Sequence, residues 1–108
     1  MKRLPRVYVY LLLSGGRQGK VYIGMTGDLR RRFKEHNSRA NTGYTRGKRW
    51  HLLAVRMFLD RGSAAKVEAE LKAYHRGKGN WRLDRWIRHE RPRLRRLCDR
   101  HGIRHRLV

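Results

Sequence analysis

Three tyrosines lie close together in the N-terminal part of this 108-residue sequence, and a phenol can act as an acid or a base. Tyr8 and Tyr10 fall in the apolar segment 7–13, and Tyr22 falls in the segment 21–25. Both segments are rich in β-branched and aromatic residues, and a glycine-rich stretch separates them, which predicts a β-hairpin. If position 10 faces 24 and 12 faces 22, Tyr10 and Tyr22 share one face of the sheet, whereas a slip of one residue separates them. The alternative is that they are ordinary packing aromatics.

Carboxylates are scarce, because the chain has only eight Asp and Glu. Two-metal phosphodiester hydrolysis needs several carboxylates around ions about 3.5–4 Å apart, and the sequence shows no such cluster. Glu68 and Glu70 are two residues apart on a predicted helix, so they point to different sides. Any metal site must therefore have few protein ligands, with one carboxylate and one hard divalent ion, Mg²⁺ or Mn²⁺. Glu68 also precedes Lys72 by four residues, the spacing of an ordinary helical ion pair.

The charge points to a polyanionic partner. Lys and Arg number 29 against 8 Asp and Glu, a formal net charge of +21 that repels itself unless a polyanion neutralises it. Nucleic acid is the first expected partner and an anionic membrane the second. The single Cys98 excludes an internal disulfide, and the apolar run 7–13 is shorter than the ~20 residues of a membrane-spanning helix. No signal-peptide pattern follows the basic start, so we expect a cytoplasmic, nucleoid-associated protein.

One helix, one loop and one strand are expected between the hairpin and residue 60. Leu29, Phe33 and His36 have the i, i+4, i+7 spacing of one helical face. Asp28 is a suitable N-cap for this helix, which should end near 37–38. A polar loop follows at 38–49, and loops of this length are often functional. The apolar segment 50–59 then predicts a third strand.

Beyond residue 60 the pattern predicts three helices and a tail of uncertain form from Ile103. The first helix has Ser63 as its expected cap, the second spans about 81–90, and Pro92 separates it from the third, which ends before Gly102. The positions expected to be buried are Val67, Leu71, Tyr74, Leu83, Trp86, Ile87, Leu94, Leu97 and Cys98.

These elements give the order ββαβααα, an α/β protein of the α+β type. We expect a small central three-stranded antiparallel sheet flanked by helices, in one domain. Its core would span 1–80, and a basic helical extension, 81–108, would pack on the same domain.

The order of the motifs resembles the GIY-YIG endonuclease family, in particular its small single-domain bacterial members. The YIG element is intact at 22–24, and YVY at 8–10 stands where the family name has GIY, with Tyr8 in place of glycine. Further similarity, over about residues 6–76, lies in the helix 29–37, Tyr44-Thr45-Arg46-Gly47, Asp60-Arg61, Ala64, Glu68 and Lys72. The resemblance implies the GIY-YIG nuclease fold.

By position, the resemblance implies two catalytic tyrosines, Tyr10 and Tyr22, and a catalytic arginine, Arg32. It also implies one metal-ligating glutamate, Glu68, and a supporting polar residue, His36, among the catalytic groups. Two departures matter. Glu70 is close enough to leave the identity of the ligand open, and Asn80 is a poor match for an asparagine that some members use.

The implied chemistry is hydrolysis with one divalent metal ion. Arg32 would hold the scissile phosphate, and Glu68 would bind one Mg²⁺ or Mn²⁺ that stabilises the leaving oxygen. Tyr10 or Tyr22 would accept a proton from water. A phenol with a pKa of about 10 is a weak base at neutral pH, and we expect nearby cations to lower that pKa.

Several residues are expected to bind nucleic acid rather than to react with it. They come from the helix expected over about 29–37 and the loop 38–49: Arg30, Arg31, Lys34, Arg39, Tyr44, Arg46, Lys48 and Arg49. Such a loop suits a flexible strand better than base-edge readout. Ten arginines within 82–106 should contact phosphates without sequence preference. Alternatively, charge runs mark solvated faces, and Trp50, Trp81 and Trp86 are core residues rather than base-stacking platforms.

The sequence therefore predicts a metal-dependent endonuclease that hydrolyses DNA phosphodiester bonds in DNA processing such as repair. It would select structure or single strands, with little sequence specificity and no obligate protein partner. The alternative is a non-catalytic or weakly catalytic DNA- or RNA-binding protein on the same scaffold. The joint presence of Tyr10, Tyr22, Arg32 and Glu68 favours the enzyme. A membrane binder lacks the necessary amphipathic helix.

Overall fold

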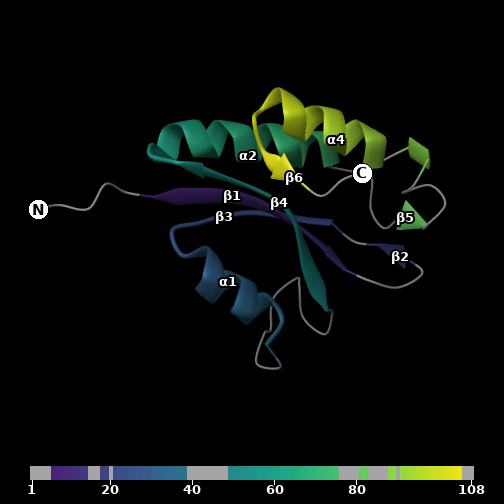
Figure 1. The fold of residues 1–108 in the computed structure, drawn as a ribbon, viewed down its shortest axis with the longest axis horizontal. Coiled ribbons are helices and arrows are strands. Elements are labelled where there is room, and N and C mark those ends of the chain that lie inside the picture. Colours follow the sequence, from purple (N-terminus) through teal and green to yellow (C-terminus); the bar gives the residue numbers. More distant parts are fainter. Residues whose placement is uncertain are drawn as a thin grey trace, which may run out of the picture.

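An antiparallel sheet lies between one helix on one side and two helices on the other in the computed structural model of the chain (Figure 1). The structure describes residues 6–14, 18–19, 21–38, 49–75, 81–82, 88–89 and 91–105. The strands are β1 (Val7–Ser14), β2 (Gln18–Gly19), β3 (Val21–Thr26), β4 (Trp50–Phe58), β5 (Trp81–Arg82) and β6 (Arg104–His105). The helices are α1 (Leu29–His36), α2 (Arg61–His75) and α4 (Arg91–Arg100).

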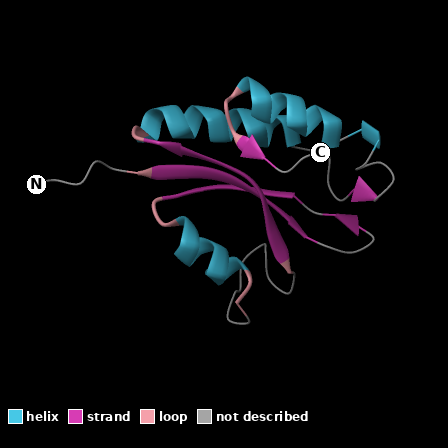
Figure 2. Ribbon diagram, viewed as in Figure 1, coloured by secondary structure: helices cyan, strands magenta, loops and turns pink. Residues whose placement is uncertain are grey.

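The main sheet has the order β3-β1-β4-β6, so β3 is an edge strand and β1 is central. Its three long strands are those expected from the sequence, and every pair is antiparallel. The α+β fold class is confirmed, with one addition. In β6, Arg104 and His105 pair with Val55 and Ala54 of β4, so part of the tail forms a fourth strand. Figure 2 shows α1 on one face of the sheet and α2 and α4 on the other.

Two local predictions are wrong. The expected helix over 81–90 starts instead with an extended pair, Trp81 and Arg82, which forms a two-stranded ribbon with β2. Pairing with a distant strand overrides the helical periodicity, as tertiary context commonly does for β-prone residues such as Trp. Residues 83–87 and 90 lie outside the described part of the chain.

The expected Ser63 cap is also wrong, because α2 begins earlier and Asp60 caps it. The Asp60 carboxylate accepts hydrogen bonds from the backbone N–H of Ser63 at 2.9 Å and of Gly62 at 3.2 Å. The Ser63 hydroxyl donates to the same carboxylate at 2.7 Å. A carboxylate can satisfy several of the free N–H groups of a first turn at once, which a single hydroxyl cannot.

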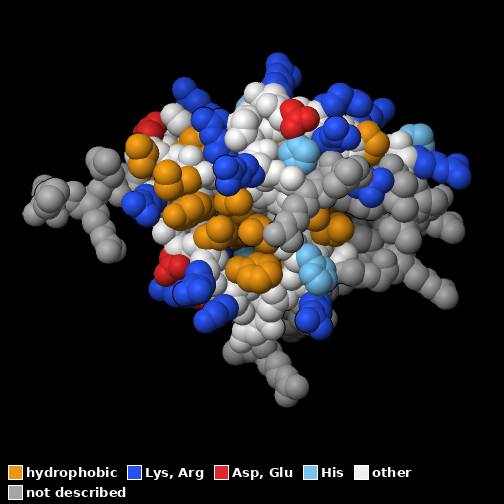
Figure 3. Space-filling model, viewed as in Figure 1, with side chains coloured by type: hydrophobic (Ala, Val, Ile, Leu, Met, Phe, Trp, Pro, Cys, Tyr) orange, Lys and Arg blue, Asp and Glu red, His pale blue; other side chains and the backbone are white. Residues whose placement is uncertain are grey.

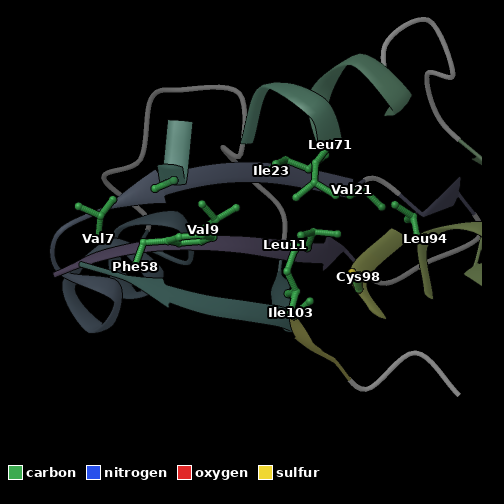
Figure 4. Close-up of a cluster of buried hydrophobic side chains, with 12 residues drawn as sticks. Val7, Val9, Leu11, Val21, Ile23, Phe58, Leu71, Leu94, Cys98 and Ile103 are labelled. Carbon is green, nitrogen blue, oxygen red and sulfur yellow. The ribbon is translucent and has the colours of Figure 1, made fainter. Parts of the chain in front are cut away.

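The larger core lies between the sheet and the two helices α2 and α4. Figure 4 shows side chains of β1 and β3 pointing toward those of α2, α4 and the segment after α4. Buried members include Val9, Leu11, Ile23, Leu71, Leu94, Cys98 and Ile103. The core roles expected for Leu71, Leu94 and Cys98 are therefore confirmed, while the side chain of Tyr74 lies outside the description. Burial raises the pKa of the Cys98 thiol to about 11, so this thiol stays protonated.

The segment after α4 is fastened to the sheet and to α2. Gly102 has a φ of 64°, the left-handed conformation that ends many helices, as expected from its position. His101 Nε2 lies 3.0 Å from Glu70 Oε2, and His105 Nε2 lies 2.6 Å from Asp99 Oδ1. The Arg56 guanidinium donates to the carbonyl of His101. These contacts hold β6 beside β4 and place α4 over the core.

We predict that Leu94→Ala lowers the free energy of unfolding by about 2–5 kcal/mol, because Leu94 is fully buried and its truncation leaves a cavity. Leu59→Ala is the matched control, since Leu59 is 53% exposed, and it should cost less than about 0.5 kcal/mol. Urea unfolding monitored by tryptophan fluorescence measures both. Equal effects would show that α4 is not part of the core.

Candidate active site

The two tyrosines share one face of the sheet. In the β1–β3 register Tyr10 pairs with Gly24 and Leu12 pairs with Tyr22, the register that places Tyr10 and Tyr22 together. Their ring centroids are 6.1 Å apart. The predicted pairing of 10 with 24 and of 12 with 22 is therefore confirmed, and with it the shared face of Tyr10 and Tyr22. A shift of one residue would have sent one ring to the opposite face of the sheet.

Gly24 makes room for the Tyr10 ring. A Cβ atom on Gly24 would lie 2.5 Å from Tyr10 Oη, 2.6 Å from Tyr10 Cζ and 2.9 Å from Tyr22 Cε1. Tyr10 is 1% exposed and has no free volume to move into at a close-packed site. The φ of Gly24 is not positive, so the backbone conformation does not require a glycine here. The glycine of the YIG element is needed instead because the Tyr10 ring packs directly against its Cα.

A β-bulge in β4 brings Trp50 to the same face. The β1–β4 register shifts between Leu11 and Leu12, which pair with Ala54 and Leu52, so Leu53 is the extra residue. Beyond the bulge the alternation of faces is inverted, and Trp50 joins the tyrosines instead of the opposite core. Its ring packs edge-on to Tyr22 with centroids 6.3 Å apart. Trp50 is 1% exposed, which confirms the core role over base stacking.

Helix α1 covers this cluster. Asp28 caps its N-terminus by accepting from the N–H of Arg31 at 3.1 Å, and the helix ends at Asn37, both as expected. Leu29 and Phe33 pack against the aromatic side chains on the sheet, and His36 is buried. The three residues of the predicted apolar face therefore all point to the sheet.

Asn37 fastens the end of α1 to β4, which the sequence did not reveal. Its amide Nδ2 donates to the carbonyl of Trp50 at 3.2 Å, and its Oδ1 accepts from the N–H of Trp50 at 2.7 Å. The side chain thus acts like a neighbouring strand. The sequence indicates only that an asparagine at this position can cap the helix. It does not indicate the hydrogen-bond partner, which lies 13 residues further along the chain.

His36 is hydrogen-bonded to the first tyrosine. Its Nε2 lies 2.9 Å from Tyr10 Oη, and its ring is 4.6 Å from the Tyr22 ring. Burial, and then the positive charge of Arg32, lower the pKa of His36 below its usual value near 6.5. The imidazole is therefore neutral at pH 7, so one nitrogen can accept the Tyr10 proton.

Tyr10 does not have the lowered pKa expected for a phenol among cations. Burial raises the pKa of Tyr10 to about 12, and the neighbouring Tyr22 adds to the rise. Arg32 pulls in the opposite direction but does not compensate. The lowering effect expected of Arg32 is therefore present, but desolvation of the buried Tyr10 outweighs it and the net shift is upward.

Arg32 lies between the tyrosines and an acidic partner. Its Nη1 is 3.0 Å from Glu35 Oε2, and Arg31 Nε is 3.3 Å from Glu35 Oε1. Hydrogen bonds to Glu35, which has the larger effect, and to Tyr10 raise the pKa of Arg32, so Arg32 stays a cation. Its side chain is 45% exposed, so solvent or substrate can reach it. Glu35 was not singled out from the sequence, although its spacing of three and four residues from two arginines was visible.

Glu68 lies on α2, on the opposite face of the sheet from α1. Its side chain is 19% exposed and its Oε1 is 3.6 Å from Lys72 Nζ, the ion pair that the spacing allowed. Glu70 is 50% exposed and faces His101 instead. Among the described residues, no three His, Cys, Asp or Glu side chains form a metal-binding group. Glu68 therefore fits only a site with a single protein carboxylate, in which water and phosphate oxygens would supply the other ligands of Mg²⁺.

Four of the residues expected to bind nucleic acid are exposed on and near α1. They are Arg30, Arg31, Lys34 and Arg49. Figure 3 shows Lys and Arg side chains gathered over α1 on one side of the molecule and over α2 and α4 on the other. The remaining expected contacts, Arg39, Tyr44, Arg46 and Lys48, lie outside the described residues. No described helix is long and apolar enough to span a membrane.

Two tyrosines in register, a histidine on one of them and an adjacent arginine are features of a GIY-YIG-type nuclease domain. The family model described as the GIY-YIG catalytic domain matches residues 6–82, and the chain belongs to this family. It is thus a member of a nuclease superfamily whose substrate is nucleic acid.

Curated relatives agree with this assignment. The chain is 38% identical over 79 residues to a UPF0213 protein of Xanthomonas axonopodis pv. citri, covering 72% of this chain and 76% of that protein. It is 41% identical over 64 residues to a UPF0213 protein of Streptococcus pneumoniae, covering 59% of each. An archaeal relative, a UPF0213 protein of Haloquadratum walsbyi, is 36% identical over 72 residues, covering 66% of this chain and 79% of the relative. No solved structure matches the chain significantly.

We predict that Gly24→Ala destabilises the protein by about 1–3 kcal/mol, because the added methyl overlaps the Tyr10 ring. It should also change the near-ultraviolet circular dichroism of the aromatic cluster. Gly27→Ala is the control, since its Cβ would meet only the Arg6 carbonyl at 3.7 Å, and it should stay within about 0.5 kcal/mol of wild type. An unaltered aromatic spectrum in Gly24→Ala would contradict the geometry.

We also predict a pH dependence of stability from His36. The pKa is lower in the folded than in the unfolded protein, so the unfolded state binds the proton first as pH falls below about 6.5. The free energy of unfolding therefore decreases with falling pH, by at most about 1.4 kcal/mol per pH unit from this one group. His36→Gln should show a shallower decrease between pH 6.5 and 5 in urea titrations. Parallel curves for the two proteins would refute the assignment.

Proposed function

We propose that this protein is a metal-dependent endonuclease that hydrolyses DNA phosphodiester bonds at the Tyr10–Tyr22–Arg32 cluster. The single observation that carries the proposal is the buried hydrogen bond between Tyr10 and a neutral His36, next to the cationic Arg32. A buried phenol needs one hydrogen-bond partner for structural reasons alone, but it does not also need a cation hydrogen-bonded to it, which Arg32 supplies.

The base is a pair of residues rather than a phenolate. With a pKa of about 12, Tyr10 alone would have to be ionised about five units above neutral pH, which costs roughly 7 kcal/mol. His36 would take the Tyr10 proton on Nε2 in the same step in which Tyr10 Oη accepts a proton from the attacking water, so no free phenolate has to form. The resulting hydroxide attacks phosphorus, and the positive charge remains on His36.

Arg32 would bind the scissile phosphate. A guanidinium can offer two N–H groups to phosphate oxygens and stabilise the charge that grows on them. In the free protein Arg32 is engaged by Glu35 at 3.0 Å, so the phosphate must replace a carboxylate oxygen. Glu35 thus keeps Arg32 positioned until the substrate arrives.

Glu68 would hold the single divalent ion, Mg²⁺ or Mn²⁺. When bound, such an ion supplies positive charge to the leaving oxygen. Lys72 is the group that the ion would displace from the carboxylate. Glu70 is less suitable, because it is already next to His101.

The expected substrate is single-stranded or branched DNA, with little sequence preference. The exposed cations on α1 meet phosphates, which carry no base identity. Such an enzyme would act in DNA processing such as repair, in the cytoplasm at the nucleoid, without an obligate protein partner.

A second candidate is a nucleic-acid-binding protein that cuts slowly or not at all. One observation favours it: both charged catalytic candidates already have partners within the chain, Arg32 with Glu35 and Glu68 with Lys72. RNA would then be as suitable a ligand as DNA.

A cleavage assay separates the two candidates. We predict that wild type cuts an end-labelled panel of single-stranded, duplex, flap and forked DNA and RNA only with Mg²⁺ or Mn²⁺. Tyr10→Phe should reduce the rate at least about 100-fold because the proton path is lost, and Glu68→Ala should abolish cutting while binding persists. Glu70→Ala, on the same helix, is the matched control and should cut like wild type.

Other results would count against specific parts of the proposal. Tight binding with no cutting of any substrate favours the second candidate. Equal losses in Glu68→Ala and Glu70→Ala would remove Glu68 as the metal ligand. A His36→Gln variant that cuts as fast as wild type at every pH between 5 and 8 would exclude the Tyr10–His36 pair as the base.

A further inference from the structure

The outer face of α4 carries a groove that the nuclease site does not use. It has a volume of about 360 Å³ and is lined by Arg93, Arg96, Leu97 and Arg100. The three arginines are exposed, while Leu97 is half-buried and forms an apolar wall. Their spacing of three, four and seven residues places all of them on one side of the helix.

This groove is on the opposite side of the sheet from the tyrosines. Helix α1, with Arg32 and His36, covers one face, and α2 and α4 cover the other (Figure 1). The buried side of α4, with Leu94 and Cys98, packs into the core, which turns its arginines outward. The sheet therefore separates the groove from the tyrosines, Arg32 and His36, and of the proposed catalytic groups only Glu68, on α2, lies on the same side as the groove.

The chemistry of the groove suits a phosphodiester backbone. The only acidic residue of α4, Asp99, is paired with His105 and does not line the groove. Arg93 and Arg100 are separated by about 10 Å along the helix axis, so their guanidinium groups can contact different phosphates of one strand. Leu97 offers an apolar surface for a sugar ring beside the phosphates.

We propose that the Arg93–Arg96–Arg100 groove is a second nucleic-acid site, which binds the phosphates of a strand or arm that is not being cut. The inference rests on the proposed function in that it takes nucleic acid as the ligand. A straight duplex segment cannot touch both faces of the sheet at once. The two sites together therefore select a flexible strand that bends around the domain, or a branch whose arms lie on opposite faces.

The test compares two triple variants with the same charge change. Arg93→Gln, Arg96→Gln and Arg100→Gln together remove the groove, and Arg6→Gln, Arg61→Gln and Lys66→Gln together remove three exposed cations that lie outside α1 and α4. Binding of a fluorescent 30-nucleotide single strand is followed by anisotropy over a series of salt concentrations. The groove variant should lose about 2 from the log–log salt slope, since each phosphate contact contributes about 0.7. It should bind at least about tenfold more weakly, and the control should keep most of the slope.

Two further measurements make the outcome decisive. A variant with Arg93→Lys, Arg96→Lys and Arg100→Lys keeps the charge and should restore the salt slope, which excludes a folding defect as the cause. At saturating substrate the groove variant should cut at the wild-type rate, because the groove does not touch the reacting atoms. Equal slopes in the groove variant and the control would overturn the proposal, because binding would then reflect net charge alone.

The same experiments separate this inference from the proposed nuclease function. If wild type binds through the groove but cuts nothing, the groove stands and the nuclease assignment fails. If wild type cuts and the two triple variants bind alike, the nuclease assignment stands and the groove fails. Absence of any binding by wild type would overturn both.

Discussion

The close approach of the Tyr10 phenol to the backbone of Gly24 is the constraint on which the site depends. It requires the β1–β3 register that pairs these two residues, and it tolerates no side chain at position 24. Once Tyr10 lies there, its hydroxyl reaches His36 at the end of α1. The orientation of α1 is fixed in turn by Asn37, which bonds to the start of β4. Sheet register, helix position and hydrogen bond are thus one connected arrangement.

The burial that fixes this geometry also determines which chemistry is possible. A nearly inaccessible phenol has a pKa of about 12, so it cannot serve as a free base near neutral pH. The same low-dielectric surroundings lower the pKa of His36, so its imidazole is neutral and can hydrogen-bond to the Tyr10 hydroxyl. Opposite shifts in two hydrogen-bonded groups are a usual sign of assigned acid and base roles. Arg32 lowers the pKa of Tyr10 without offsetting the effect of burial, and in the proposed reaction its charge would act on the phosphate.

Local signals were sufficient for the hairpin, for α1 with its Asp28 cap, for β4 and for the buried residues of α2 and α4. They failed where a partner is distant in sequence. The bulge at Leu53 depends on how β1 and β4 fit together, and without it Trp50 would face the other core. The hydrogen bonds of Asn37 and the pairing of β6 with β4 are likewise non-local. The shared face of Tyr10 and Tyr22 could be predicted only conditionally, because it depends on the register, and their catalytic role came from the family resemblance. The pKa of Tyr10 required knowledge of its burial.

The sheet separates the groups that the proposed reaction must bring to one phosphate. Arg32 belongs to α1 and Glu68 to α2, on opposite faces. Strand β3 touches both helices, through the Tyr22–His36 ring contact on one side and the packing of α2 on the other. Because β3 is an edge strand, its outer side is open to a ligand in the described sheet. A phosphate that meets both Arg32 and an ion on Glu68 must therefore lie at the β3 edge, and the nucleic acid must pass from one face of the sheet to the other.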